Sequence, residues 1–420
     1  MSPFLIFLRA FGSLFLGAIV FFSFLAFLLT IQIRNNFLEP SFYTDALAEN
    51  DIYNRIYDEL LLDPEYDEEV RRLTGDFNIA RQDVVDLVRK VLPPEYLQAE
   101  SEASINRIIA YLDNETEDLE AFIDLSLPIQ NIRPVVLDYI DSQIDSMEVV
   151  PVSTIRELAR ELESFLRTVE NKSVPLQVPS LDRVPPSLRA QAFDEALDAL
   201  KRDSTLPPRS ISDLEEQGNA IKAELVGGDV RAALKLAVPP LANALIDDAI
   251  AELRLELDSQ DRIDLVAELA EDNDETRAEF LEDADAVRDQ IDAAQTVGPI
   301  VSLLVMALTT AALGLVHLPH WRFSLLWPSL VLLITGAVFL VVGVVLKTQL
   351  PDRLASECGV LPSSACHMLT DVFNTMGSEI AGGFITPSIA IIVIGAVALA
   401  LSIALLVRKR PEAPELKQGF

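Results

Sequence analysis

The sequence predicts an all-α fold, in which four membrane-spanning helices are combined with a large acidic helical domain between the first and second of them. The chain has 420 residues and a net charge of −32, yet half of its residues are hydrophobic and its mean hydropathy is +0.28. These properties belong to different segments, because four long apolar runs contain no charged residue. The composition excludes a nucleic-acid-binding protein, a simple soluble enzyme and a disulfide-rich secreted scaffold.

The first apolar run, residues 10–33, follows a short N-terminus at 1–9 that we expect to be cytoplasmic. A membrane core of about 30 Å requires roughly 20 helical residues, so this run is long enough to cross it. A cleaved signal peptide has an apolar core of roughly 7–15 residues and small residues at its cleavage site. Residues 31–36 provide no such small pair, and we therefore predict a retained signal anchor.

Three further apolar runs are predicted to be the second, third and fourth membrane helices, at residues 297–316, 323–346 and 384–407. The absence of ionisable residues at membrane depth counts against a proton-coupled transporter or a charged ion filter. Some alanines recur at a four-residue spacing that allows membrane helices to approach closely: Ala307 and Ala311, and Ala396, Ala400 and Ala404. Chance in alanine-rich helices explains this spacing equally well.

Basic residues near the ends of the runs predict the orientation of the chain in a cell membrane. An even number of spans places Arg9, the loop at 317–322 and the tail at 408–420 on one side, which is predicted to be cytoplasmic. The segments at 34–296 and 347–383 are then expected to be extracytoplasmic. Three basic residues in those segments oppose this orientation: Arg34, Lys347 and Arg353.

The predicted outer loop at 347–383 contains both cysteines of the chain, Cys358 and Cys366. Seven residues separate them, and an oxidising compartment favours a disulfide that closes this short loop, with two reduced thiols as the alternative. Apolar residues at helical spacing follow the second cysteine: Leu369, Val372, Phe373, Met376 and Ile380. They predict an amphipathic helix that lies on the membrane surface or against the acidic domain.

The segment between the first two runs is strongly acidic and helical in its pattern. Residues 35–296 contain 59 Asp and Glu against 24 Lys and Arg, a net charge of −35, whereas the other 6 acidic and 9 basic residues sum to +3. Apolar residues recur at helical spacing in these stretches: 40–62, 79–92, 94–112, 134–147, 153–169, 187–200 and 229–294. The last stretch is expected to form one long helix, or two, leading into the second membrane run. The hairpin dipeptides Asn-Gly and Asp-Gly are absent, which favours an all-α domain.

Prolines indicate where the acidic segment is divided. Four of them lie within residues 173–186, which we interpret as an extended linker between a helical lobe at 34–172 and a second at 187–296. Pairs of prolines also precede predicted amphipathic helices: Pro93-Pro94, Pro185-Pro186 and Pro239-Pro240. Their irregular spacing does not indicate a repeat architecture, and prolines that begin helices are the simpler interpretation.

The acidic segment lacks the residues that most catalytic sites require. Residues 35–296 contain no His, Cys or Trp, which excludes a typical zinc site and a serine or cysteine triad there. The chain has no glycine-rich phosphate-binding motif, and 59 carboxylates make any one acid pair uninformative. The stretch at 272–276 resembles part of a calcium loop, but Arg277 and Asp283 replace the required Gly and Glu. We therefore predict no catalytic residue, cofactor or metal site.

The function is expected to be non-enzymatic. We interpret the acidic helical domain as an interaction, sensing or scaffold module, and we expect no nucleic-acid partner. The expected partners are the lipid bilayer and another membrane or extracytoplasmic protein, or a cationic ligand. Solubility in a saline habitat is a second explanation of the charge, and a carboxylate-based calcium-binding module is an alternative function.

The order of one span, a large outer domain and three spans is similar to that of permeases of the mechanotransmission-type ABC family. This resemblance, which covers topology alone, implies a permease-like component of a transport complex. The chain departs from that pattern in two places. Only nine residues precede the first run, and the six-residue loop at 317–322 is too short to dock on an ATPase.

Overall fold

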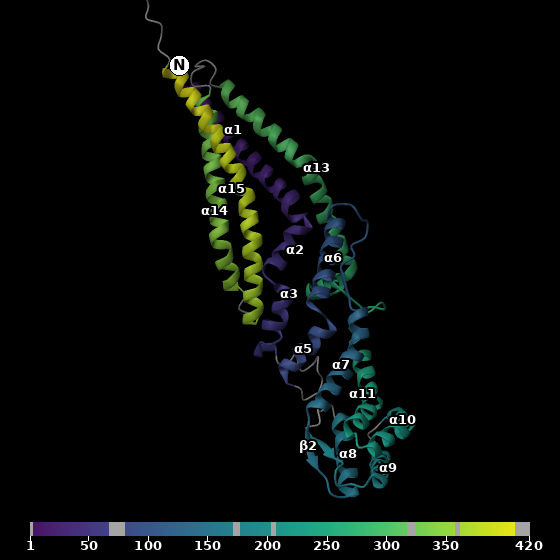
Figure 1. Cartoon of the computed structure of the whole chain (residues 1–420). Helices are drawn as coiled ribbons and strands as arrows, with labels where there is room; N and C mark the ends of the chain where they lie inside the picture. Colours follow the sequence, from purple (N-terminus) through teal and green to yellow (C-terminus); the bar gives the residue numbers. More distant parts are fainter. Residues whose placement is uncertain are drawn as a thin grey trace, which may run out of the picture. The chain divides into compact units, whose positions relative to one another are not determined.

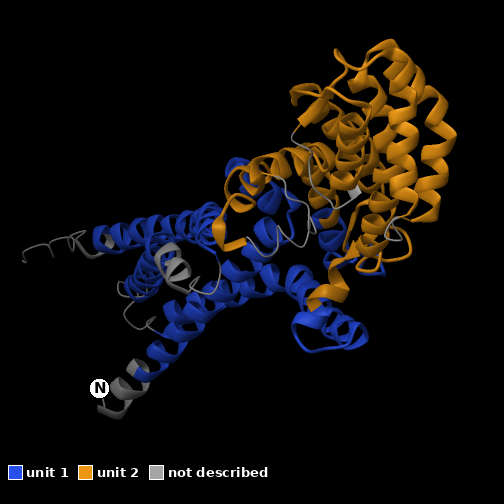
Figure 2. Cartoon of the chain, turned by 90° about the horizontal axis from the view of Figure 1, so that it is seen from below, with its two compact units in different colours: residues 1–52, 105–120, 270–420 blue, residues 53–104, 121–269 orange. Residues whose placement is uncertain are grey.

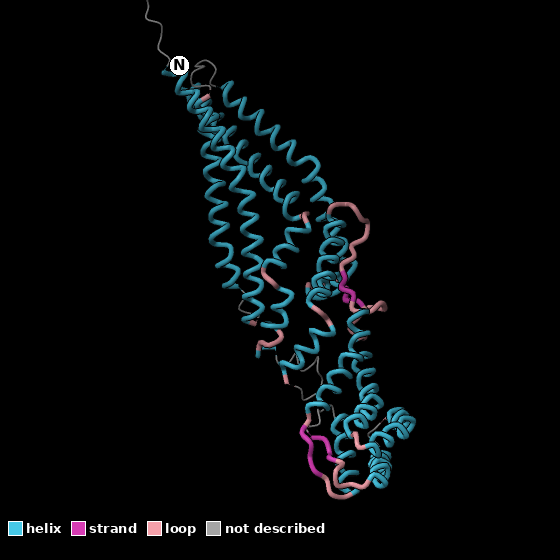
Figure 3. The backbone as a smooth tube through the Cα atoms, in the orientation of Figure 1, coloured by secondary structure: helices cyan, strands magenta, loops and turns pink. Residues whose placement is uncertain are grey.

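The structure is a computed structural model in which the described residues are nearly all helical (Figure 1, Figure 3). The described residues are 3–66, 80–170, 177–202, 207–316, 325–357 and 362–407. They form two compact units, which Figure 2 shows in different colours: unit 1, at 1–52, 105–120 and 270–420, and unit 2, at 53–104 and 121–269. The predicted all-α fold is confirmed in its coarse form, and the described part of the chain adds four short strands to it.

Unit 1 contains four helices that are long and apolar enough to cross a membrane. Its elements are α1 (Pro3–Gln32), the π-helical turn η1 (Ile33–Phe37), α2 (Pro40–Glu49), the end of α6 (Pro94–Leu112), α13 (Arg277–Val316), α14 (Leu326–Glu357) and α15 (Ser363–Val407). The apolar parts of α1, α13, α14 and α15 correspond to the four predicted runs, so the multi-pass membrane prediction is supported by length and composition. The predicted loop at 317–322 and tail at 408–420 lie outside the described residues.

Three of these helices are much longer than a membrane is thick. α13 has 40 residues, α14 has 32 and α15 has 45. At about 1.5 Å per residue even the shortest exceeds a membrane core of about 30 Å. The helix that the sequence predicts after Cys366 is the first half of α15, continuous with the fourth apolar run, and not a separate helix on a membrane surface. This half of α15 also carries the contacts with α2.

Helix α1 contacts each of the other three long helices in unit 1. Val20, Phe24 and Leu28, on one face of α1, are almost completely buried among residues of α13, α14 and α15. The ring of Phe339 on α14 stacks on Phe21 at 4.8 Å between centroids and meets Phe24 edge-on at 5.5 Å. The aromatic residues of the first run therefore form the centre of the packing among these helices.

Glycines allow close approach between the apolar helices. A β-carbon on Gly336 of α14 would lie 2.7 Å from a carbon of Ile392 on α15. A β-carbon on Gly298 of α13 would lie 2.5 Å from the side chain of Thr30 on α1. Such distances are shorter than atoms in contact allow, so these helices fit together at the two glycines because a side chain is absent there.

Unit 2 is built mainly from helices of medium length. Its elements are α3 (Ile52–Arg55), η2 (Ile56–Leu60), η3 (Pro64–Tyr66), α5 (Arg81–Val91), the start of α6, β1 (Phe122–Asp124), α7 (Ser126–Ser146), β2 (Glu148–Pro151), α8 (Ile155–Glu170), β3 (Gln177–Ser180), α9 (Pro186–Lys201), α10 (Pro208–Gly227), α11 (Val230–Leu253), β4 (Arg262–Asp264) and α12 (Leu265–Asp272). β1 pairs antiparallel with β4, placing Ile123 opposite Ile263. β2 pairs in parallel with β3, placing Val149 opposite Val178.

One apolar core joins the helices on both sides of the predicted linker at 173–186. Leu166 of α8, Val178 of β3 and Phe193 of α9 are almost completely buried in the same cluster. The linker begins outside the described residues, which resume at β3. The compact units thus have different boundaries from the two predicted lobes, because α8 and α9 bury their apolar faces against each other.

The stretch at 229–294 differs most from its predicted structure. It was expected to form one or two long helices, but it forms α11, α12 and the first half of α13, with β4 after α11. Asp258 makes the interrupting turn, because its Oδ1 accepts a hydrogen bond of 3.0 Å from the backbone N of Arg262. Pro239 and Pro240 lie inside α11 and do not precede it. α10 was not among the predicted helices.

Candidate functional site

A polar pocket lies beside the ends of two apolar runs, those of α1 and α13. Its volume is about 460 Å³. The residues that line it are Arg34, Leu38, Glu39, Asp113, Gln295 and Thr296. The first three follow the apolar run of α1, and the last two directly precede the apolar run of α13. We refer to it as the membrane-edge pocket.

The chain turns sharply at the end of α1, which brings Glu39 to this pocket. The backbone N of Leu38 donates to the carbonyl of Ile33 at 3.0 Å, closing the π-helical turn, and the N of Glu39 donates to the carbonyl of Asn36 at 3.0 Å. Glu39 has extended backbone angles of −98° and 114° because Pro40, the first residue of α2, follows it. A proline at that position begins a new helix, so the path of the chain is set locally.

Polar contacts hold the end of α6 against α13. We call these residues the α6–α13 clamp: Tyr111, Asp113, Asn114, Asp285, Arg288 and Gln295. Tyr111 Oη donates to Asp285 Oδ1 at 2.7 Å, and Gln295 Nε2 donates to Asp113 Oδ1 at 3.0 Å. Arg288 Nε donates to Asn114 Oδ1 at 2.5 Å. The clamp and the membrane-edge pocket share Asp113 and Gln295, so the clamp shapes one wall of the pocket.

The centre of the clamp is largely shielded from water. Tyr111 is 2% exposed, and the guanidinium carbon of Arg288 lies 4.8 Å from the centre of its ring. Burial, followed by the hydrogen bond to Asp285, raises the pKa of Tyr111 to about 12. The phenol therefore remains protonated at neutral pH and acts as a hydrogen-bond donor.

Buried polar groups also connect the end of α1 with the interior of α15. Gln32, the polar residue of the first apolar run, is 2% exposed, and its Nε2 donates to the carbonyl of Ile380 at 2.6 Å. Asn36 Nδ2 donates to Gln32 Oε1 at 2.5 Å. Gly383 leaves the space for this amide, because a β-carbon there would clash with Gln32 Nε2. A buried amide with both ends paired avoids the cost of an unsatisfied polar group.

The membrane-edge pocket combines one cation with two carboxylates. Arg34 is exposed, and within the described part of the chain no carboxylate forms an ion pair with it. Glu39 accepts a long hydrogen bond of 3.4 Å from Ser41 Oγ, while Asp113 is held by Gln295. The hydroxyl of Thr296 donates a long hydrogen bond of 3.4 Å to Asp292 Oδ1, and the six lining residues include no histidine or cysteine, so the chemistry of the pocket fits the binding of a polar group and not bond cleavage.

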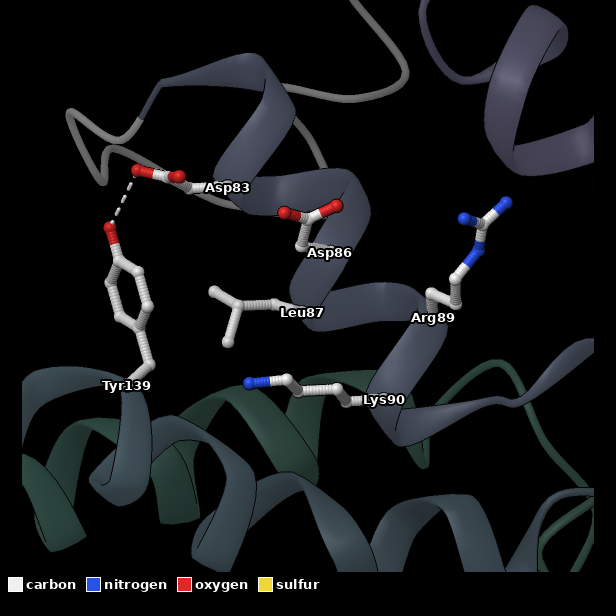
Figure 4. A pocket seen from close by; sticks show the side chains of 6 residues that line it. All are labelled: Asp83, Asp86, Leu87, Arg89, Lys90 and Tyr139. Atoms are coloured by element: carbon white, nitrogen blue, oxygen red, sulfur yellow. Dashed lines mark hydrogen bonds between the residues drawn. The ribbon is translucent and has the colours of Figure 1, made fainter. Parts of the chain in front are cut away.

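A second pocket lies between α5 and α7 in unit 2 (Figure 4). It has a volume of about 290 Å³ and is lined by Asp83, Asp86, Leu87, Arg89, Lys90 and Tyr139. Tyr139 Oη donates to Asp83 Oδ2 at 3.1 Å. Figure 4 shows Arg89 pointing away from Tyr139, and Arg89 pairs with Asp58 at 2.7 Å. Lys90 is thus the cation of this pocket that faces Tyr139.

The second pocket also lacks a nucleophile prepared for catalysis. Burial, followed by the hydrogen bond to Asp83, raises the pKa of Tyr139 to about 12. A phenol with that pKa donates hydrogen bonds but does not act as a base near neutral pH. The pocket is shallow and mixed in charge, and we assign no ligand to it.

The predicted disulfide remains a prediction. Cys366 lies in the first turn of α15 and is half-buried. Cys358 lies outside the described residues.

The calcium-like stretch at 272–276 runs from the end of α12 to the N-terminal cap of α13, which is Thr276. The backbone N of Thr276 donates to Glu279 Oε2 at 2.9 Å, and the N of Glu279 donates to Thr276 Oγ1 at 3.3 Å. This reciprocal pair is a capping box, and its hydrogen bonds lower the pKa of Glu279. Among the described residues, no group of three or more His, Cys, Asp or Glu is placed to hold a metal ion.

The residues of the membrane-edge pocket were not identified from the sequence. Arg34 and Gln295 do flank the first and second apolar runs, which is the one local signal that pointed to this place. Asp113 has no such signal, because it is separated from Gln295 by 182 positions and is one of 65 acidic residues.

No protein family, curated protein or solved structure matched this chain in sequence or fold comparisons.

Proposed function

We propose that the chain is an integral membrane protein whose acidic helical segment at 34–296 lies outside the cytoplasm and acts as an interaction and sensing module. The termini and the loop at 317–322 are cytoplasmic in this proposal. The observation that carries it is the continuity of α13, a single helix that contains Pro299 and runs from the acidic segment into the second apolar run. A helix of 40 residues transmits a displacement along its axis more directly than a flexible linker does.

Contacts at both ends of α13 support transmission. Its first half is held to α6 through Asp285, Arg288 and Gln295. Its second half packs along α1, with Leu313 almost completely buried against that helix. A partner that moves the end of α6 would therefore move α13 against α1 at membrane depth.

The composition of the acidic segment also supports binding over catalysis. It offers carboxylates in excess but neither histidine nor cysteine. Residues 35–296 carry a net charge of −35, and the long-range attraction of this charge favours a partner with a basic surface. The partner class is therefore a membrane or extracytoplasmic protein that presents lysines and arginines.

Crosslinking on intact cells, followed by purification of the full-length chain, tests the interaction. We expect a protein partner whose recovery falls when salt is raised before crosslinking, because long-range attraction between charges is screened. Recovery of no partner, together with a hydrolytic activity of the purified chain, would overturn the proposal.

Labelling of single cysteines tests the orientation. In a Cys358→Ser, Cys366→Ser background, Ser259→Cys places a thiol in an exposed turn of the acidic segment, and Gln418→Cys places one in the tail. A membrane-impermeant maleimide is expected to label the Ser259→Cys variant on intact cells. It is expected to label the Gln418→Cys variant only after the cells are lysed. The opposite labelling pattern would show that the chain has the reverse orientation in the membrane.

Pulsed electron-spin spectroscopy tests the transmission. Spin labels at Leu14 of α1 and Leu315 of α13, which are 74% and 62% exposed, report the distance between these helices in nanodiscs. Arg288→Ala removes the centre of the clamp and is expected to broaden or shift the distances, whereas Arg156→Ala, an exposed arginine of α8, is not. An unchanged distribution in a folded Arg288→Ala variant would refute transmission through α13.

A further inference from the structure

We propose that the membrane-edge pocket binds the headgroup of a phospholipid that carries a primary ammonium, such as phosphatidylethanolamine. This inference goes beyond the sensing function and does not depend on it. It requires only that the apolar runs of α1 and α13 cross a membrane.

The pocket lies at the depth where lipid headgroups are found. The apolar run of α1 ends at Ile33, directly before Arg34, and the apolar run of α13 begins at Val297, directly after Thr296. The hydrocarbon core of a membrane ends where its helices change from apolar to polar residues. The pocket is therefore expected at the level of the phosphates of one leaflet.

The face of α13 below the pocket offers a surface for acyl chains. Thr296 lines the pocket, and Ile300 and Leu304 follow it at four-residue intervals, which places all three on one face of the helix. Ile300 is 69% exposed and Leu304 is 55% exposed. A lipid with its headgroup beside Thr296 can extend its chains along these side chains.

The charges of the pocket match a zwitterionic headgroup. Arg34 has a guanidinium that pairs with no carboxylate among the described residues, and guanidinium binds phosphate with two parallel hydrogen bonds. Glu39 and Asp113 line the same pocket and accept hydrogen bonds from an ammonium group. An anionic headgroup would meet these two carboxylates without an ammonium to neutralise them.

The carboxylates also distinguish between zwitterionic lipids. A primary ammonium donates three hydrogen bonds, whereas a choline headgroup donates none. Glu39 and Asp113 accept from Ser41 Oγ and Gln295 Nε2, and their remaining acceptor positions gain donors from phosphatidylethanolamine but none from phosphatidylcholine. The pocket is thus expected to select the amine as well as the phosphate.

Native mass spectrometry of the full-length protein in detergent, with phosphatidylethanolamine, phosphatidylcholine or phosphatidylglycerol added at equal concentration, tests the proposal. We expect the wild type to retain phosphatidylethanolamine at least tenfold more tightly than the other two. Equal retention of all three lipids would overturn the proposal, and this comparison needs no variant to fold.

Substitutions locate the bound lipid. Arg34→Ala is expected to reduce retention of phosphatidylethanolamine about tenfold, while Lys347→Ala, an exposed cation at the end of another apolar run, leaves it unchanged. Glu39→Gln with Asp113→Asn is expected to remove the preference over phosphatidylcholine. Equal losses in Arg34→Ala and Lys347→Ala would overturn the site, with thermal unfolding used to verify that each variant is folded.

A water-soluble competitor separates a lipid from a free headgroup compound. Glycerophosphoethanolamine carries the same charged groups without acyl chains. We expect it to displace the lipid only at concentrations at least a hundredfold higher. Displacement at concentrations equal to that of the lipid would show that the pocket serves a soluble phosphoamine and would overturn the lipid assignment.

Discussion

The two compact units are helical, but different contacts hold their helices together. In unit 2, apolar side chains of α7 to α11 form one cluster, in which residues such as Phe193 and Leu214 are hidden from solvent. In unit 1, the apolar helices meet at glycines such as Gly336 and through the buried amide of Gln32. Water drives apolar groups together, whereas lipid does not, so membrane helices depend on close fit and hydrogen bonds. The same type of substitution is therefore expected to have different effects in the two units.

The largest effect is expected from truncation of the core of unit 2. Phe193 is 1% exposed, and Phe193→Ala is expected to lower the free energy of unfolding by about 3–5 kcal/mol because it leaves a cavity. Leu188 on the same helix is 37% exposed, and Leu188→Ala is expected to cost less than about 1 kcal/mol. Urea unfolding of the full-length protein, followed by circular dichroism, measures both. Similar costs for the two variants would show that this cluster is not the stabilising core.

In the membrane helices, addition of a methyl group is expected to be the damaging change. Gly336→Ala places a carbon 2.7 Å from Ile392 and 3.0 Å from the carbonyl oxygen of Ser388, and is expected to cost about 1–3 kcal/mol. Gly12→Ala meets no atom within 4 Å and serves as the matched control, which is expected to be neutral or slightly stabilising. Thermal unfolding in detergent measures the difference. Equal stability of the two variants would contradict the close fit of α14 and α15.

The cap of α13 is expected to have a smaller effect. Thr276→Ala removes a hydrogen bond of 3.3 Å from the backbone N of Glu279 and is expected to cost about 1 kcal/mol. Thr276→Ser keeps the acceptor oxygen and is expected to retain the stability of the wild type. Hydrogen exchange of the first turn of α13 measures local opening, and equal protection in the two variants would exclude the capping role.

A separate effect, on the ionisation of buried tyrosines, is expected at high pH. The pKa values of Tyr57, Tyr111 and Tyr139 are raised to about 12, in each case chiefly by burial. Because an unfolded tyrosine ionises near pH 10, the contribution of these phenols to stability is complete below pH 10 and is lost as pH rises toward 12. Absorbance near 295 nm is expected to show a late phase that Tyr111→Phe reduces. A single transition near pH 10 for all tyrosines would contradict the burial of these rings.

Local patterns predicted the helices well where a proline marks the first turn. Pro94–Leu112 forms the predicted helix with the same bounds, and α9 begins at Pro186, one residue before its predicted start. The prediction of continuous helix failed where a side-chain carboxylate accepts a hydrogen bond from the backbone. Asp258 makes a turn within the stretch that was expected to remain helical. The spacing of apolar residues does not predict such a turn, because the turn depends on a polar side chain.

The candidate site was much less predictable than the helices. Arg34 and Gln295 were visible as polar residues beside apolar runs, but Asp113 was indistinguishable from the other acids of the segment. The tight contact between α14 and α15 at Gly336 also has no local signature, because it depends on which residue of another helix lies opposite.

The sequence by itself determined that the chain is nearly all helical, that four runs are long and apolar enough to cross a membrane, and where its negative charge lies. These properties depend on composition and on periodicity within about 20 residues. Only the tertiary structure showed that α15 continues beyond its apolar run, that one core crosses the predicted linker, and that Asp113 meets Gln295. Such features depend on contacts between distant segments, whose partners local periodicity does not specify.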